Sequence, residues 1–409
     1  MSTATNKATT TPERDGGRRA TTVRYAIAEP TDLGVDPVKL DELRQRARRE
    51  IDDGLLPSCQ LAVARHGKLV LFETLGAAAP ASRYVIFSMT KGIIAGAIWM
   101  LVGDGSIGWS DRVADHIPEF ASNGKQDITI EQLLTHTSGF PTAPLNPLAG
   151  ATSAGRTERF ALWRLNWEPG TRFEYHPTSA HWVLGEIIER VSGMDVRDFV
   201  HTRIFEPLAL TTFRLGEPAD HQADINPLVS VGELPTPEEI EAIIGIKIDI
   251  AELLGEVTID NLLQFNQPAV REVGVPGGGG ISTAADIALY YQAVLHNRDK
   301  LWDPKVIEAG VEPIVDLPDP LRGMPAHRSR GLQVAGDPPD AQLRAFGHGV
   351  SPRTYGHDGA GGQIAWADPV SGLSFCYLTN GLDQHMIRQA RRTIALSSRA
   401  AATVPASPT

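Results

Sequence analysis

At 409 residues, the chain is long enough for one large catalytic unit or for two domains. Its hydrophobic share of 42% and charged share of 21% are those of an ordinary globular protein. The net charge of −11 argues against a nucleic-acid or anionic-membrane partner. Cys59 and Cys376 lie in separate apolar runs without a CxxC partner, so we expect buried thiols rather than a disulfide, a zinc site or a cysteine nucleophile.

The two ends of the chain differ from the rest in composition. Residues 1–24 lack the apolar core of a secretory signal and are predicted to form a disordered leader, and residues 400–409 a flexible tail. The longest apolar stretch, Gly92–Val102, is about half of the roughly 20 residues that a membrane-spanning helix needs. We therefore expect a cytoplasmic protein with one domain over residues 25–399 and no membrane span.

A helix, a hairpin and a second helix are predicted first. Apolar residues recur at helical spacing over Asp36–Asp53. Cys59–Gly76 contains two apolar runs hinged at His66-Gly67-Lys68, which is typical of a hairpin. Ser88–Gly103 is apolar nearly all round and is predicted to be a buried helix.

The middle of the chain is predicted to be helical, with Pro- and Gly-rich loops. Clear helices are expected over Thr129–His136, His181–Val191, Val196–Ile204 and Thr283–Leu295. Asp220–Val275 is less regular. Within it, Pro235–Leu254 is a predicted helix, because its acidic start suits the helix macrodipole.

The last part of the chain returns to strands. Gly361–Pro369 and Leu373–Gly381 are predicted strands joined by a turn at Asp368-Pro369, and Met386–Ser397 is a predicted helix. Because strands lie at both ends of the sequence, the economical architecture is one sheet built from both, with a helical half inserted at about residues 109–290.

An S-x-x-K motif, Ser88-Met89-Thr90-Lys91, opens the apolar helix. Residues at i and i+3 share a helical face, so the lysine amine can approach the serine hydroxyl. The hydroxyl is a weak nucleophile until a base takes its proton, and lysine is such a base only when burial lowers its pKa. The apolar residues after Lys91 supply that burial. A second match, Ser122–Lys125, lies in a polar turn where we expect nothing to bury the lysine, so Ser122 is interpreted as a surface residue.

Six motifs in order carry a family resemblance. They are FSMTKG (87–92), LLTHTSG (133–139), EPGTRFEY (168–175), HWVLGEIIE (181–189), GGGGISTAADIA (277–288) and GHDGAGG (356–362). Together they resemble the serine β-lactamase-like family of class C β-lactamases, penicillin-binding proteins, D-amino-acid peptidases and family VIII carboxylesterases. The resemblance implies an α/β (α+β) fold of the β-lactamase/transpeptidase type. In that fold an antiparallel sheet is flanked by the terminal helices and joined to an all-helical half, with the active site between them.

The family's second motif, Y-x-N, here reads Tyr175-His176-Pro177. The resemblance implies that Tyr175 relays protons, provided that the nearby ammonium lowers its pKa, and the alternative is a packed aromatic residue. Pro177 cannot supply the side-chain amide with which β-lactamases hold a substrate amide.

The third motif, K-T-G in β-lactamases, becomes His357-Asp358-Gly359. The resemblance implies that Gly359 keeps the strand edge open for a substrate, and that the N–H of Ala360 forms an oxyanion hole with that of Ser88. His357 can donate a hydrogen bond but carries no permanent charge, so a substrate carboxylate would lose its best anchor.

Other motifs receive a structural interpretation. His136 is expected to hold a loop near the site, and Gly277–Gly280 to form a tight turn beside it, since no P-loop lysine follows. The sequence contains neither an H-E-x-x-H zinc motif nor a G-x-S-x-G elbow. No metal or organic cofactor is expected.

The predicted function is that of a serine hydrolase that forms an acyl-enzyme on Ser88, with Lys91 and Tyr175 activating the deacylating water. Loss of the motif asparagine and lysine favours a carboxylesterase acting on small or medium acyl esters. The alternatives are an amide hydrolase of the β-lactamase or D-peptidase type, and an acyltransferase. A non-catalytic binding protein would have no need to retain all three residues. Asp220–Val275 is expected to shape the acyl pocket.

Overall fold

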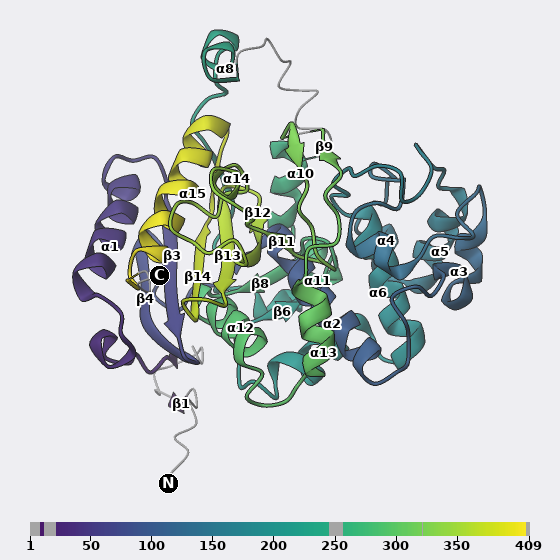
Figure 1. Cartoon of the computed structure of the whole chain (residues 1–409), viewed down its shortest axis with the longest axis horizontal. Helices are drawn as coiled ribbons and strands as arrows, with labels where there is room; N and C mark the ends of the chain where they lie inside the picture. Colours follow the sequence, from purple (N-terminus) through teal and green to yellow (C-terminus); the bar gives the residue numbers. More distant parts are fainter. Residues whose placement is uncertain (1–8, 12–21, 245–256, 321, 406–409) are drawn as a thin grey trace.

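A six-stranded antiparallel sheet forms one half of the molecule (Figure 1). The computed structural model describes residues 9–11, 22–244, 257–320 and 322–405. In sheet order the strands are β11 (Gln333–Val334), β12 (Tyr355–Gly359), β13 (Gln363–Asp368), β14 (Leu373–Thr379), β3 (Ser58–Arg65) and β4 (Lys68–Gly76). Because β14 pairs with β3, the sheet joins the two ends of the sequence, as predicted.

Helices cover both faces of this sheet, because its side chains are apolar on both sides. The terminal helices α1 (Pro37–Asp52) and α15 (Met386–Ala401) pack together over one face, and α12 (Ala284–His296) packs on the other (Figure 1). Cys59 belongs to the apolar cluster on the α1 and α15 side, and Cys376 to the cluster on the α12 side. Both thiols are buried and free, as the sequence predicts.

The helical half lies beside the sheet, at the right of Figure 1. Its apolar centre is α2 (Thr90–Gly103), which packs against α6 (Ser179–Ser192). Around these two helices lie α3 (Val113–His116), α4 (Ile130–Leu134), α5 (Ser153–Leu162) and α7 (Val196–Val200), which continues as a π-helical turn over His201–Phe205. The predicted two-part fold is therefore confirmed.

Short strands interrupt the predicted helical half. A three-stranded sheet has the order β5 (Tyr84–Val85), β8 (Gly280–Ser282) and β6 (Arg214–Leu215), and β7 (Val229–Val231) runs parallel to β15 (Gly381–Asp383). The remaining elements are α10 (Ile259–Leu263), α11 (Pro268–Val273), α13 (Pro304–Val311), β9 (Pro318–Asp319), β10 (Met324–Pro325) and α14 (Asp340–Leu343). Such two- and three-residue strands leave too short an alternating pattern to be recognised in sequence.

Several boundaries differ from the predictions. Within the predicted leader, β1 (Thr9–Thr11) and β2 (Thr22–Arg24) pair with each other. Helix α8 spans Pro237–Ile244, and the rest of the predicted Pro235–Leu254 helix lies mostly outside the described residues. Helix α15 runs past the predicted start of the tail, and Thr403 beyond it is buried. Among the helices described, none is long and apolar enough to cross a bilayer.

A buried ion-pair network fastens the two terminal helices and gives a first prediction. Arg392 of α15 is fully buried and donates to Glu50 of α1 at 2.6 Å and to Asp383 of β15 at 2.7 Å. Arg392→Met leaves both carboxylates without this partner, so we expect a loss of about 3 kcal/mol in the free energy of unfolding, measured in urea. The exposed neighbour Arg391 provides the control, because Arg391→Met should change stability by less than about 0.5 kcal/mol. Equal effects of the two substitutions would contradict this role.

Candidate active site

Ser88 lies in a 3₁₀ turn, Phe87–Met89, immediately before α2. Phe87 has a φ of 46°, a left-handed conformation that a bulky residue adopts only when its surroundings enforce it. The Thr90 hydroxyl does so from one side, because it donates to the Phe87 carbonyl oxygen at 2.6 Å and accepts from the Gly280 N–H at 2.9 Å. The serine is therefore presented on a turn held between α2 and the small sheet.

Lys91 is completely buried, with its Nζ 3.1 Å from Ser88 Oγ. Nζ also donates to the carbonyl oxygens of Pro177 at 2.7 Å and of Gly277 at 2.5 Å. A neutral amine has two N–H groups, which these carbonyls occupy, so its lone pair is left for the serine hydroxyl. Burial, assisted by the nearby Arg328 cation, lowers the pKa of Lys91 to about 7.

The glycine run 277–280 allows the backbone to approach this lysine closely. A Cβ on Gly277 would lie 3.0 Å from Thr178 Cα, and one on Gly280 would lie 2.7 Å from Thr90 Oγ1. The N–H groups of Gly278 and Gly279 both donate to the Val275 carbonyl oxygen, which closes the turn. The run is thus a tight turn beside the site, as predicted, and it contributes a direct acceptor for Lys91.

Tyr175 packs its ring beside the amine of Lys91, with Nζ 5.1 Å from the ring centroid. Contrary to the sequence-based expectation, the pKa of Tyr175 is raised above its ordinary value. Burial is the main cause and the Asp358 carboxylate adds to it, while a hydrogen bond with Ser88 acts in the opposite direction. The lysine does not lower the pKa of the phenol as expected, because an amine with a pKa of about 7 has already lost its charge at the alkaline pH where a phenol ionises. Tyr175 therefore keeps its proton at neutral pH.

His136 holds the backbone on both sides of Tyr175. The Glu174 N–H donates to the His136 carbonyl oxygen at 3.3 Å, and the His176 N–H donates to His136 Nδ1 at 3.2 Å. The His136 ring lies 4.8 Å from the tyrosine ring, centroid to centroid. Burial lowers the pKa of both histidines, that of His176 to about 3, so both are neutral. This is the loop-holding role that the sequence predicts for His136.

The third motif brings strand β12 against the turn that carries Ser88. A Cβ on Gly359 would lie 2.7 Å from the carbonyl oxygen of Ile86, so only glycine allows this approach. The Gln363 side-chain amide then donates to the carbonyl oxygens of Val85 at 3.1 Å and of Ala360 at 3.2 Å. The close approach and this bridge hold Ala360 near the segment that carries Ser88.

His357 is fully buried on the same strand, and both of its ring nitrogens are occupied within the protein. Nδ1 lies 2.7 Å from the Asp358 carbonyl oxygen and must carry the proton, while Nε2 accepts from Arg328 Nη1 at 3.4 Å. Burial and the Arg328 cation lower the pKa of His357 to about 3. The neutral ring therefore has no free N–H with which to anchor a substrate.

Arg328 is a component of the site that the sequence analysis missed. It is 3% exposed, and its Cζ lies 5.5 Å from the Tyr175 ring centroid and 5.7 Å from that of Phe173. It comes from an irregular segment 29 residues before His357 and matches no motif, so only the folded chain reveals it.

The second S-x-x-K match shows that burial alone does not distinguish the two lysines. Lys125 is fully buried, so the expectation that nothing would bury it is wrong. Its Nζ donates to the carbonyl oxygens of Ser122 at 2.6 Å and Trp163 at 2.7 Å, and burial lowers its pKa to about 8. The difference lies in the serine, since the Ser122 hydroxyl donates to the Ala161 carbonyl oxygen at 2.7 Å. The ring near Lys125 is Phe120, which has no hydroxyl.

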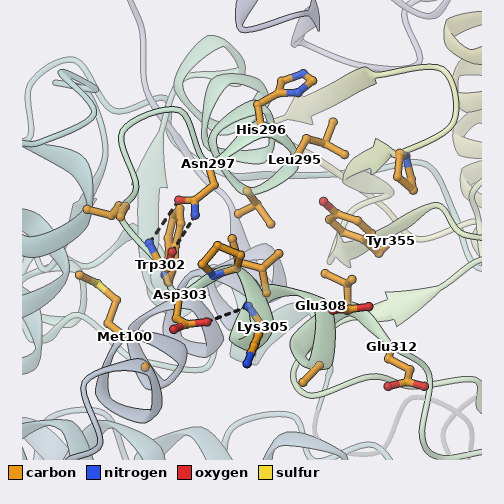
Figure 2. Close-up of a pocket in the computed structure, with 18 of the residues that line it drawn as sticks. Met100, Leu295, His296, Asn297, Trp302, Asp303, Lys305, Glu308, Glu312 and Tyr355 are labelled. Carbon is orange, nitrogen blue, oxygen red and sulfur yellow. Dashed lines mark hydrogen bonds between the residues drawn. The ribbon is translucent and has the colours of Figure 1, made fainter.

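A cavity of about 1360 Å³ lies away from these residues (Figure 2). It opens beside α13 and the ends of α2 and α12, and neither Ser88, Lys91 nor Tyr175 lines it. Its wall mixes Lys305, Glu308 and Glu312 with apolar groups such as Met100, and shows no convergent catalytic pair (Figure 2). In the described part of the chain, no group of three His, Cys, Asp or Glu side chains is arranged to hold a metal ion.

Comparison with known proteins identifies the family of the chain. The Beta-lactamase family model matches residues 43–399, most of the chain. The chain belongs to the beta-lactamase family. All six motifs that carry the resemblance lie within the matched region.

Several known proteins with different names are similar to this chain. A penicillin-binding protein homologue from Caulobacter crescentus is 26% identical with a TM-score of 0.75, over 90% of this chain and 99% of that one. A family VIII carboxylesterase shares the fold at 22% identity and a TM-score of 0.71, with 90% and 99% covered. A Salmonella agona protein with the provisional name of a D-alanyl-D-alanine carboxypeptidase is 27% identical over 88% of this chain and 87% of its own. The relatives thus include names for both ester and peptide hydrolysis.

The pKa of Lys91 gives a prediction for pH dependence. Only the neutral amine can accept the Ser88 proton, and the amine is protonated below its pKa of about 7. Acylation of Ser88, followed as kcat/KM for an activated ester, should therefore rise with pH through a midpoint near 7 and fall about tenfold per pH unit below it. A rate that is flat between pH 5 and 8 would contradict the role of Lys91 as the base.

Proposed function

We propose that this protein is a carboxylesterase of the beta-lactamase family that acts through an acyl-enzyme on Ser88. The observation that carries the proposal is the contact of Ser88 Oγ with a buried lysine whose two N–H groups are taken up by carbonyl oxygens. This arrangement leaves the serine hydroxyl as the hydrogen-bond donor and the amine as the acceptor, as a nucleophile and its base require.

The proposed reaction has two balanced halves. Ser88 Oγ attacks the ester carbonyl carbon while its proton passes to Lys91, and the N–H groups of Ser88 and Ala360 stabilise the oxyanion. The tetrahedral intermediate expels the alcohol, which takes a proton from Lys91 through the Tyr175 hydroxyl, and the acyl-enzyme remains. Water then attacks the acyl carbonyl and gives its proton to the same pair. The acid leaves as the Ser88–acyl bond breaks and Ser88 regains its proton.

Tyr175 acts in this scheme as a protonated relay rather than as a phenolate. Its raised pKa keeps the phenol neutral, so its O–H can donate toward the leaving oxygen while it accepts a proton from the amine. The amine, with a pKa of about 7, is the group that changes charge.

Ester specificity is supported by what the second and third motifs lack. Pro177 offers no side-chain amide, and its carbonyl oxygen is used to hold Lys91. His357 is buried and neutral, with its single N–H bonded to Asp358. Neither residue can hold the amide or the carboxylate of a peptide-like substrate, which favours neutral acyl esters. Amide hydrolysis is the second candidate, favoured by the peptidase-type name among the relatives.

A substrate panel tests the ester preference. We expect p-nitrophenyl esters of up to about eight carbons to be hydrolysed with a kcat/KM at least about 10²-fold above that of a chromogenic cephalosporin, a difference of about 3 kcal/mol in transition-state binding. The Ser88→Ala variant is the control and should lose both activities. A cephalosporin hydrolysed as efficiently as the best ester would contradict the proposal and favour the amide hydrolase.

The Tyr175→Phe variant tests the relay. It removes the hydroxyl but keeps the ring that packs on His136 and Lys91, so stability should fall by at most about 1 kcal/mol. General acid–base groups contribute about 10²–10⁴-fold, and kcat should fall by that factor. A matched control is Tyr25→Phe, which removes a half-buried hydroxyl bonded to Asp286 outside the site and should leave kcat unchanged. A Tyr175→Phe enzyme that retains more than about half of kcat would exclude the tyrosine from the reaction.

A further inference from the structure

The buried guanidinium of Arg328 forms no ion pair in the described part of the chain, although the Asp358 and Asp319 carboxylates lie near enough to favour its charged form. Of its five N–H donors, Nη1 reaches His357 Nε2 at 3.4 Å, while Nε is buried without any hydrogen bond in the part of the chain described. Its backbone is fixed, because its N–H donates to the Val315 carbonyl oxygen at 2.9 Å and its own carbonyl accepts from Ile314 at 2.9 Å. A charge that is costly to bury is thus held in one place beside the catalytic groups.

The other charged groups nearby compensate one another or are neutral. Asp358 pairs with Arg322 at 3.4 Å rather than with Arg328. The histidines that face Lys91 and Tyr175 have lowered pKa values because they are buried, and they are therefore neutral at pH 7; they are His136, His176, His181 and His357. Among the described groups, Arg328 is thus a cation beside Tyr175 and Lys91 that no ion pair neutralises, whereas Arg322 is paired with Asp358.

We propose that Arg328 is a positioning residue of this site. It holds His357 in place and supplies, next to Tyr175, the positive charge that β-lactamases carry on the lysine of their third motif. The proposal rests on the Ser88–Lys91 chemistry of the proposed function. Because Arg328 can only donate, it forces His357 Nε2 to be the acceptor and so fixes the ring with its proton on Nδ1. The histidine occupies the motif position, and the arginine carries the charge.

This charge has a defined effect on the base. A fixed cation near Lys91 disfavours its ammonium form and makes the neutral amine available at lower pH, whereas Asp358 acts in the opposite direction. Arg328 therefore helps the buried lysine to act as a base near neutral pH.

The first test follows the labelling of Ser88 by a fluorophosphonate as a function of pH, since this reaction needs the nucleophile and its base but no particular ester. The wild-type rate should rise with a midpoint near pH 7. In Arg328→Gln the midpoint should move up by about one pH unit, which lowers the rate at pH 7 about fivefold and leaves the rate at pH 9 nearly unchanged. Arg328→Lys keeps the charge and should stay within about 0.3 pH unit of the wild type.

Arg330→Gln is the matched control. This neighbouring guanidinium is bonded to Glu131 at 2.7 Å and stacks on Trp109, so its loss should not move the midpoint. A folded Arg328→Gln enzyme with an unshifted midpoint would overturn the proposal, as would an equal shift in Arg328→Lys. Wild-type enzyme that is never labelled at Ser88 would instead reject the proposed function.

A charge exchange tests the same point without any reaction. His357→Lys places a second cation against Arg328, so its thermal unfolding midpoint should be lower than that of the wild type. The His357→Lys/Arg328→Gln double variant again has one cation at this place, now on the side chain of residue 357. We expect the double variant to unfold at least about 2 °C above His357→Lys. A double variant that unfolds at or below the midpoint of His357→Lys would show that the two positions do not share one charge, and would overturn the proposal.

Discussion

Burial of the Lys91 amine against the Ser88 hydroxyl is the interaction on which the rest of the site depends. Lowering the pKa of this lysine to about 7 corresponds to roughly 5 kcal/mol disfavouring its charged form. The apolar surroundings of helix α2 impose this cost, and two carbonyl acceptors offset part of it by binding the N–H groups of the amine. They come from the Pro177 loop and the Gly277 turn, 86 and 186 residues from Lys91 in the sequence. Hydrogen bonds to these two carbonyl oxygens fix the orientation of the neutral amine. Its lone pair is then directed toward the Ser88 hydroxyl.

The surrounding architecture can be understood as support for that arrangement. The glycine run brings the backbone within reach of Nζ, and Thr90 links that run to the turn carrying Ser88. On the other side, Gly359 lets strand β12 approach Ile86. The sheet is in turn fastened at both ends of the sequence by β3, β14 and the α1–α15 pair. The candidate site therefore lies where the two halves of the fold meet.

The sequence predicted the sheet, the terminal helices and the identity of Ser88, Lys91 and Tyr175 as candidates, because long periodic segments and ordered motifs are local patterns. It did not predict the protonation of Tyr175, which depends on how deeply the folded chain buries the phenol. It also missed the burial of Lys125, because a polar turn becomes covered only by contacts with the Trp163 segment. Arg328 could not be found in sequence, since its role arises from a contact with His357 rather than from spacing.

The central claim is that Ser88, and not the similarly placed Ser122, is the nucleophile. The most direct measurement is mass spectrometry of the protein after reaction with a fluorophosphonate, with peptide mapping of the adduct in the wild type, Ser88→Ala and Ser122→Ala. The account predicts one adduct per chain on Ser88 in the wild type and in Ser122→Ala, and none in Ser88→Ala, because only the Ser88 hydroxyl faces its lysine without being bonded to a backbone carbonyl as Ser122 is. An adduct that persists in Ser88→Ala and disappears in Ser122→Ala would contradict it.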